Sequence, residues 1–439
     1  MQSATAPGAP GKGRAGGTFR ALKHRNFQLF FSGQIISLVG TWMQTVAQAW
    51  LIYRLTGSGA LLGVLGFVGQ FPIFLLSPLA GLAADRWPRQ RVVIATQTTS
   101  MVLAFILAAL TMTGRIRVWE IIVLATLLGI VNAFDVPARQ SFMIEMVGRE
   151  DLINAIALNS SMFNLARVAG PAIAAGLVAV VGEGWCFLLN GLSYLAVIAG
   201  LFLMRIQKRI AVHDGAAPLE KLREGLRFAR HTKPIRALLV LVAIVSFMAL
   251  PYTVLMPIFA VQILHGGVNA YGWLMGAVGF GAMFGALALA MRHELRGLGK
   301  VVAYAATGLG ASLVLFSASH WFWVSFMILI VSGFTMMMQF TATNTLIQSM
   351  VPDQLRGRVM SLYSMMFLGM TPFGSLLAGA LADRIGAPVT MAIGGLVSCL
   401  GGLAFARKWP AMRGPARDLV AAQGVMSPAP QPKESGPPS

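Results

Sequence analysis

The sequence predicts an all-α polytopic membrane protein with twelve transmembrane helices arranged as two six-helix halves. Of its 439 residues, 56% are hydrophobic and only 11% are charged, a composition that is too apolar for a soluble protein of this length. Apolar runs of about 20 residues, the length that crosses a bilayer as a helix, recur along the chain. These runs fall into two groups of six that are separated by a polar stretch.

The first group of runs follows a polar N-terminal segment. Residues 1–18 are rich in Gly, Ala and Pro and contain no short apolar stretch with a cleavage site, so we expect a disordered cytoplasmic lead-in and no cleaved signal peptide. Residues 19–206 form the predicted N-terminal half. Its six predicted spans are 27–53, 60–84, 92–113, 118–142, 153–181 and 185–206.

A polar linker, 207–233, connects the two halves. Within 218–231, Leu219, Leu222 and Leu226 recur on one helical face while charged residues occupy the others, which predicts an amphipathic helix at the membrane surface. The C-terminal half covers 234–406, with predicted spans 235–264, 270–291, 301–318, 321–350, 359–382 and 388–406. The tail, 407–439, is basic and then Pro-rich, and we expect it to be a disordered cytoplasmic segment.

Membrane topology explains the formal net charge of +19. An even number of spans places both termini on one side, and most of the 34 lysines and arginines lie in the termini, the linker and the turns on that side. Basic residues accumulate on the cytoplasmic side of membrane proteins, so we expect both termini in the cytoplasm and the chain in the cell (inner) membrane. Because these residues are scattered between apolar runs, we expect the lipid bilayer, and no nucleic acid, as a partner.

Residue patterns that indicate cofactors or enzymes are missing from the sequence. The only cysteines, Cys186 and Cys399, lie within apolar runs in opposite halves, so we expect no metal and no cofactor. The sequence contains no Gly-x-x-x-x-Gly-Lys-Ser/Thr, His-Glu-x-x-His or Gly-x-Ser-x-Gly segment. It therefore argues against an ATPase or an intramembrane hydrolase.

The two groups of spans also resemble each other. Gly63 and Leu65 align with Gly272 and Leu274, and further pairs align at nearly the same offset. The pattern indicates a duplication. Two parallel six-helix halves with a cytoplasmic linker are the organisation expected of a secondary transporter whose site lies between repeats.

A charged turn lies between the second and third spans. The turn resembles the pattern Gly-x-x-x-Asp-Arg-x-Gly-Arg-Arg/Lys through Gly81, Asp85, Arg86, Arg89 and Arg91. Pro88 and Gln90 depart from the pattern. This turn resembles the conformational latch of the major facilitator superfamily. A copy of the pattern, Gly379-Ala-Leu-Ala-Asp383-Arg384-Ile-Gly386, follows the eleventh span on the opposite face, where we expect no latch.

A second set of residues resembles one branch of that superfamily. The segments are Pro137-Ala-Arg139-Gln140 and Asn164-Leu-Ala-Arg167-Val-Ala-Gly170-Pro171. They are similar to enterobactin-type siderophore exporters and related transmembrane secretion effectors. The resemblance covers residues 19–406 and implies a major facilitator fold. It also implies that the protein exports a small amphipathic or siderophore-like molecule by alternating access in exchange for protons. We expect the protein to work as a monomer.

Asp135 and Arg139 lie one turn apart in the fourth predicted span. They fit an internal ion pair between residues i and i+4. The family resemblance implies instead that Asp135 meets Arg89 and locks the cytoplasmic side of an outward-open state. A third possibility is direct protonation of Asp135 during transport. No histidine lies well inside a span, so Asp135 and Glu120 are the proton-coupling candidates.

Arg167 falls near the expected membrane midplane, where a charge costs at least ~2.5 kcal/mol unless it faces protein or water. Ser160, Asn164 and Arg167 share one helical face by their spacing. The face is suited either to structural hydrogen bonds or to contact with an anionic or catecholate substrate.

Other polar side chains within spans are candidates for lining a central cavity, with helix–helix hydrogen bonding as the alternative: Gln44, Gln48, Gln339 and Asn344. Aromatic and methionine side chains within spans are candidates for an adaptable apolar lining, with simple packing or lipid contact as the alternative: Trp42, Trp50, Tyr252, Phe340 and residues 336–338. Gly170 and Pro171 begin a small-residue run that predicts close helix packing.

The sequence leaves the direction of transport open. An importer or a lipid flippase of the same fold is the alternative within transport. A non-transporting membrane sensor or scaffold is the alternative outside it, although a scaffold does not require the polar stripe of Ser160, Asn164 and Arg167.

Overall fold

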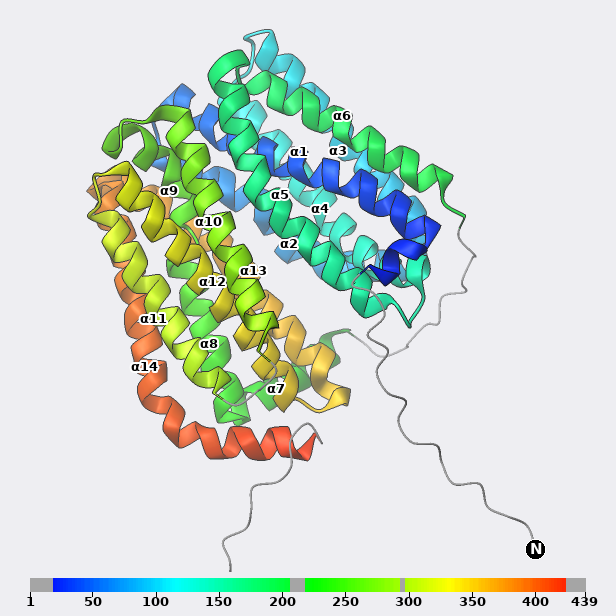
Figure 1. Cartoon of the computed structure of the whole chain (residues 1–439), viewed down its shortest axis with the longest axis vertical. Helices are drawn as coiled ribbons and strands as arrows, with labels where there is room; N and C mark the ends of the chain where they lie inside the picture. Colours follow the sequence, from blue (N-terminus) through cyan, green and yellow to red (C-terminus); the bar gives the residue numbers. More distant parts are fainter. Residues whose placement is uncertain (1–18, 206–217, 293–296, 424–439) are drawn as a thin grey trace, which may run out of the picture.

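The computed structural model describes the backbone of residues 19–205, 218–292 and 297–423, and the side chains of these residues except 77–86 and 218–223. The described residues form helices and turns without a strand, and twelve of the helical segments are long and apolar enough to cross a membrane. The fold class predicted from the sequence is therefore confirmed. Figure 1 shows the two six-helix halves.

The first half begins with a 3₁₀ turn, η1 (Arg20–Lys23). Six helices follow it: α1 (Arg25–Thr56), α2 (Gly59–Arg86), α3 (Arg89–Met112), α4 (Val118–Val147), α5 (Leu152–Val181) and α6 (Glu183–Leu203). The tight connection from α1 to α2 depends on Gly57, whose φ of 64° is left-handed and readily adopted only by glycine.

The second half follows the linker helix α7 (Pro218–His231), which occupies the range where the sequence predicts an amphipathic helix. Its helices are α8 (Lys233–Met248), α9 (Tyr252–Ile258), η2 (Phe259–Ile263), α10 (Gly267–Ala290), α11 (Leu298–Ser317), α12 (Phe322–Met350), α13 (Asp353–Ile385) and α14 (Ala387–Ala422). Helix α7 packs on α13, where Arg358 forms an ion pair with Glu224.

The seventh span is discontinuous, whereas the sequence predicts one helix over 235–264. Helix α8 ends at Met248, α9 starts at Tyr252, and η2 is a π-helix. Pro251 precedes α9 and has no N–H to continue the helix. Breaks of this kind in transporters place side chains and free backbone groups at the membrane midplane.

The last helix is longer than predicted. Helix α14 continues to Ala422, so the expectation of disorder from residue 407 is wrong for residues 407–422. Trp409, Met412, Ala416 and Val420 recur at helical spacing and are buried, and this apolar face stabilises the extension. The extension turns and runs across the base of the second half (Figure 1).

The halves pack through α2 against α13 and α5 against α10. We call the face where α1 begins and α14 ends the terminal face, and the opposite face the far face. Near the far face, a Cβ atom on Gly63 would lie 2.6 Å from the carbonyl oxygen of Ser375, and one on Gly272 would lie 2.7 Å from that of Pro171. The halves are therefore in close backbone contact at the far face, and their helices diverge toward the terminal face (Figure 1).

Candidate functional site

Arg167 lies at the seam between the halves. Its Nη2 atom is 3.8 Å from the sulfur of Met336 on α12, and its guanidinium carbon is 5.8 Å from the centre of the Trp42 ring on α1. The backbone of α5 is held close to α1 and α10: a Cβ atom on Gly170 would lie 3.0 Å from a carbonyl oxygen of α1, and one on Gly279 of α10 would lie 2.9 Å from that of Arg167. Three helices from both halves thus meet at this guanidinium.

Pro171 contributes to this arrangement through the backbone. A proline has no N–H to donate, so the carbonyl of Arg167, four residues earlier, has no helical partner. That carbonyl faces Gly279 of α10. Gly170 and Pro171 therefore lie in a close-packed region between α1, α5 and α10, as the small-residue run predicts.

Tyr252, the first residue of α9, belongs to the same site. Its side chain is buried, and its hydroxyl interacts electrostatically with Arg167. Among the described residues, no atom satisfies hydrogen-bond geometry to this hydroxyl. The break in the seventh span determines the position of Tyr252. The sequence indicated this residue only as apolar lining, because the predicted span was continuous.

The electrostatics of the site favour an anion. Among the described residues, no carboxylate forms an ion pair with Arg167, and its guanidinium lies against a sulfur and an aromatic face. Arg167 is half-buried. Withdrawing a cation from water without an anionic partner is costly, whereas a desolvated arginine binds a carboxylate or phosphate strongly. The site therefore combines a cation with apolar and aromatic neighbours.

The predicted stripe on α5 leads to this site. Ser160 is exposed, and Asn164 donates from Nδ2 to the carbonyl oxygen of Ser160 at 2.9 Å. Seven residues of helix, roughly 10 Å, separate Ser160 from Arg167. The stripe therefore runs from the terminal face toward the seam.

The glutamine candidates on α1 lie elsewhere. Gln44 accepts a hydrogen bond from Asn190 of α6 at 2.7 Å, and Gln48 donates to the carbonyl oxygen of Ile121 on α4 at 3.5 Å. Both side chains are buried within the first half. In this structure each amide joins helices of one half, which corresponds to helix–helix hydrogen bonding, one of the two alternatives from the sequence.

The candidates on α12 differ from one another. Gln339 is fully buried, and neither amide atom has a hydrogen-bond partner among the described residues. Asn344 accepts a hydrogen bond from Gln348 on the same helix. Gln339 therefore remains a candidate for a ligand contact, whereas the Asn344 contact is local to its helix.

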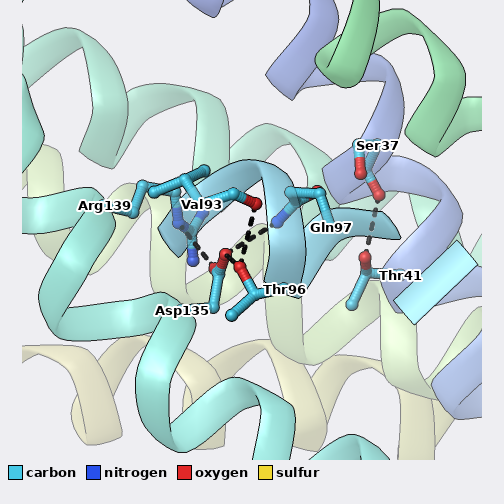
Figure 2. A network of polar contacts seen from close by, with 7 residues as sticks. All are labelled: Ser37, Thr41, Val93, Thr96, Gln97, Asp135 and Arg139. Atoms are coloured by element: carbon cyan, nitrogen blue, oxygen red, sulfur yellow. Dashed lines mark hydrogen bonds and ion pairs between the residues drawn. The ribbon is translucent and has the colours of Figure 1, made fainter. Parts of the chain in front are cut away.

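Asp135 is at the centre of a polar network inside the first half (Figure 2). Its Oδ2 atom lies 3.1 Å from Nε of Arg139, while Thr96 and Gln97 of α3 donate to Oδ1 at 2.8 and 2.9 Å. The residue is 3% exposed. Of the two partners considered from the sequence, Arg139 is the one that this conformation contains.

Arg89 binds a different acid. Its Nη1 atom donates to the carbonyl oxygen of Ser141 and to Oε1 of Glu145, both at 3.0 Å. The expected contact between Arg89 and Asp135 is therefore absent from this structure. The sequence prediction missed Glu145 because the fourth span was expected to end at 142, whereas α4 continues to Val147.

The rest of the charged turn is only partly described. The side chains of Gly81, Asp85 and Arg86 lie outside the described ones, and Arg91 is exposed. The part of the latch that rests on Gly81, Asp85 and Arg86 therefore stays a prediction.

The copy of the pattern on the far face makes the contact between halves. Asp383, near the end of α13, accepts hydrogen bonds from the hydroxyl of Ser58 at 2.7 Å and from the N–H groups of Gly59 and Ala60 at 2.6 and 3.0 Å. It thus caps the N-terminus of α2 in the other half. The sequence did not predict this contact, because it does not reveal which helix start lies opposite Asp383.

Glu120, the other proton-coupling candidate, lies at the start of α4. It accepts a hydrogen bond from the N–H of Arg117 at 2.8 Å in a capping box. This contact is structural and lies far from the seam, at the far-face end of the helix.

The fold and its relatives identify the class of protein: a transporter of the major facilitator superfamily, and not an enzyme. Residues 16–431 match the family described as "Transmembrane secretion effector", and the chain belongs to that family.

Relatives and solved structures agree with this assignment. The chain is 27% identical to the staphyloferrin A transporter of Staphylococcus aureus, covering 84% of this chain and 92% of the relative. It is 25% identical to the multidrug efflux pump Tap of Mycolicibacterium fortuitum, covering 80% and 88%. A bacterial homologue of the human lysosomal transporter Spinster has the same fold, with a TM-score of 0.65 at 15% identity over 92% of this chain and 98% of that one.

Proposed function

We propose that the protein exports a small amphipathic molecule bearing an anionic group, such as a siderophore, by alternating access and in exchange for protons. The observation that carries this proposal is Arg167, a guanidinium at the seam between the halves without a carboxylate partner among the described residues. A substrate anion would supply that partner. The relative named as a staphyloferrin A transporter supports a siderophore substrate.

The direction of export rests on the topology. The terminal face is cytoplasmic in this proposal, since most lysines and arginines lie in the segments of that face. Close contacts at the far face and the diverging helices of the terminal face correspond to an inward-open state (Figure 1). A substrate then enters from the cytoplasm along the stripe of Ser160 and Asn164 and reaches Arg167.

Proton coupling is assigned to Asp135. This carboxylate is buried within the membrane-spanning part and interacts with Arg139, Thr96 and Gln97. Protonation would remove its charge, weaken the ion pair with Arg139 and loosen α3 from α4. The protein works as a monomer in this proposal, because both halves of the site come from one chain.

A second candidate function is the efflux of uncharged or weakly charged drugs. Arg167 contacts Trp42 and Met336. These neighbours favour drug efflux, because methionine and aromatic side chains adapt to varied ligands. The similarity to multidrug efflux pump Tap also supports it.

Transport assays in proteoliposomes with an imposed pH gradient test these assignments. We expect staphyloferrin A and other anionic siderophores to be moved faster with the gradient, and Arg167→Gln to reduce this by on the order of tenfold to a hundredfold, because a hydrogen bond to a charged group contributes about 1.5–3 kcal/mol. Arg167→Lys should retain part of the activity. Asp135→Asn should abolish the response to the gradient while substrate exchange continues.

The control is Arg115→Gln, which removes an exposed charge far from the seam. If Arg167→Gln slows uncharged drugs as much as anionic siderophores, the arginine is structural. Efflux that is indifferent to the pH gradient in the unmodified protein would exclude proton antiport.

A further inference from the structure

A cavity lies on the terminal face, away from the seam. It has a volume of about 370 Å³ and lies between the start of α11 and the extension of α14. Lys300, Arg413 and Arg417 line one part of it. The other part is apolar and is formed by Leu346, Trp409, Ala416 and Val420. We call this cavity the basic pocket.

Three cations border the basic pocket. Lys300, Arg413 and Arg417 have exposed side chains, and within the described part of the chain none of them forms an ion pair. The first turn of α11 contains no acidic residue, and its N-cap, Gly297, offers no side-chain hydrogen bond. The N–H groups and the positive dipole end of α11 therefore add to the three cations.

The apolar part gives the basic pocket an amphipathic character. Trp409 packs directly on Gly299 in the first turn of α11, where there is no space for a side chain. Trp409, Ala416 and Val420 belong to the buried face of the α14 extension, which runs across the base of the second half (Figure 1). The basic pocket therefore has a cationic part that is exposed and an apolar part that is within the protein.

We propose that the basic pocket binds the phosphate-bearing headgroup of an anionic phospholipid. The phosphate would accept hydrogen bonds from Arg413, Arg417 and Lys300 and from the N–H groups that begin α11. The first part of the acyl chains, next to the headgroup, would contact Trp409 and Leu346. Basic pockets between transmembrane helices at a membrane surface suit such headgroups, whereas a soluble phosphate would use only the polar part.

Native mass spectrometry of the full-length protein in detergent, titrated with phosphatidylglycerol or phosphatidylcholine, tests the proposal. The unmodified protein should retain phosphatidylglycerol in preference to phosphatidylcholine. Arg413→Gln together with Arg417→Gln should weaken phosphatidylglycerol binding by on the order of tenfold, since each basic residue near an anionic surface contributes to the attraction. Arg407→Gln together with Lys408→Gln is the matched control, because it removes two charges from α14 outside the pocket.

The outcomes distinguish a lipid site from general surface attraction and from a soluble-anion site. Equal losses in the two double variants would show general surface attraction and overturn the proposal, as would unchanged binding in the pocket variant. Inorganic phosphate that displaces phosphatidylglycerol and binds with comparable affinity would identify a soluble-anion site instead. Thermal unfolding of both variants without lipid tests their folding, and a pocket variant that binds phosphatidylglycerol weakly while unfolding like the control supports the proposal.

Discussion

Two segments with the same residue pattern lie on opposite faces of the molecule and make different kinds of contact. On the far face, Asp383 of α13 binds the first turn of α2 and joins the two halves. On the terminal face, Arg89 binds Ser141 and Glu145 of α4, so its contact stays within the first half. The element that lies opposite, and not the pattern alone, decides what each segment holds.

The far-face contact depends on a helix start. The first N–H groups of α2 have no partners within the helix, and the carboxylate of Asp383 accepts two of them. One turn earlier on α13, Gly379 has no space for a side chain against α2, so the backbones approach closely. The negative charge also interacts favourably with the dipole of α2.

This difference between the faces bears on alternating access. In the proposed cycle the far face has to open, and that step separates Asp383 from α2. The hydrogen bonds of Arg89 lie within one half, so a rigid-body movement of the halves can leave them intact. The contact of Asp383 with α2 therefore exists in only one conformation of the proposed cycle, whereas the contacts of Arg89 can persist throughout it.

Among substitutions at these contacts, Asp383→Ala should change the equilibrium between the two conformations most. It removes a cap worth about 1–2 kcal/mol, which changes the ratio of two conformations by about five- to thirtyfold in favour of the far-face-open one. Spin labels at Arg115→Cys and His320→Cys, in the turns of the far face, measure the change. Electron–electron double resonance should report a larger population of long distances.

Asp353→Ala is the matched control for that experiment. Asp353 lies at the opposite end of α13 and, among the described residues, pairs with Arg356 on the same helix, so the distance distribution should not change. The labels require Cys186 and Cys399 to be replaced by Ser. An Asp383→Ala distribution identical to that of the parent would mean that the cap does not hold the far face closed.

Glu145→Gln should have a smaller effect, confined to the first half. The ion pair with Arg89 is partly exposed, and its loss should lower stability by about 1 kcal/mol or less. A lower unfolding temperature in detergent, with an unchanged far-face distance distribution, is the expected result. Arg89→Gln in the same background should add little, because the pair is already broken. A shifted distance distribution would instead make this contact part of the conformational switch.

The sequence predicted the architecture well because hydrophobic length is a local property. Twelve spans, their order and the two halves follow from runs long enough to cross a bilayer. The exceptions are also physical. The break before Tyr252 depends on how Pro251 is accommodated among neighbouring helices, and the α14 extension is stabilised by contacts of Trp409 that a basic composition conceals.

The sites were less predictable because they depend on which helices meet. Arg167 was identified from its depth alone, since an intramembrane charge is rare enough to be informative. The partners of Asp383 and Arg89 depend on distances between helices that are distant in sequence, and no pattern specifies them. Gln44 and Gln48 show the same limit. Their amide side chains suit a polar cavity, but the face of α1 on which they lie packs within the first half.

The smallest expected effect concerns a cluster on the terminal face that lies outside the membrane spans. Asp151 accepts a hydrogen bond from His24 at 2.8 Å and pairs with Arg20 at 3.2 Å, and these contacts lower the pKa of its carboxyl, the His24 hydrogen bond most strongly. A lowered pKa means that the contribution to stability is complete above the ordinary value of about 4 and is lost as the pH falls through the lowered one. Asp151→Asn should therefore reduce the unfolding temperature slightly at neutral pH, and the difference from the unmodified protein should disappear in acid. A difference that persists below that range would show that Asp151 acts through neutral hydrogen bonding, and the terminal face would then lack a pH-dependent contact at this position.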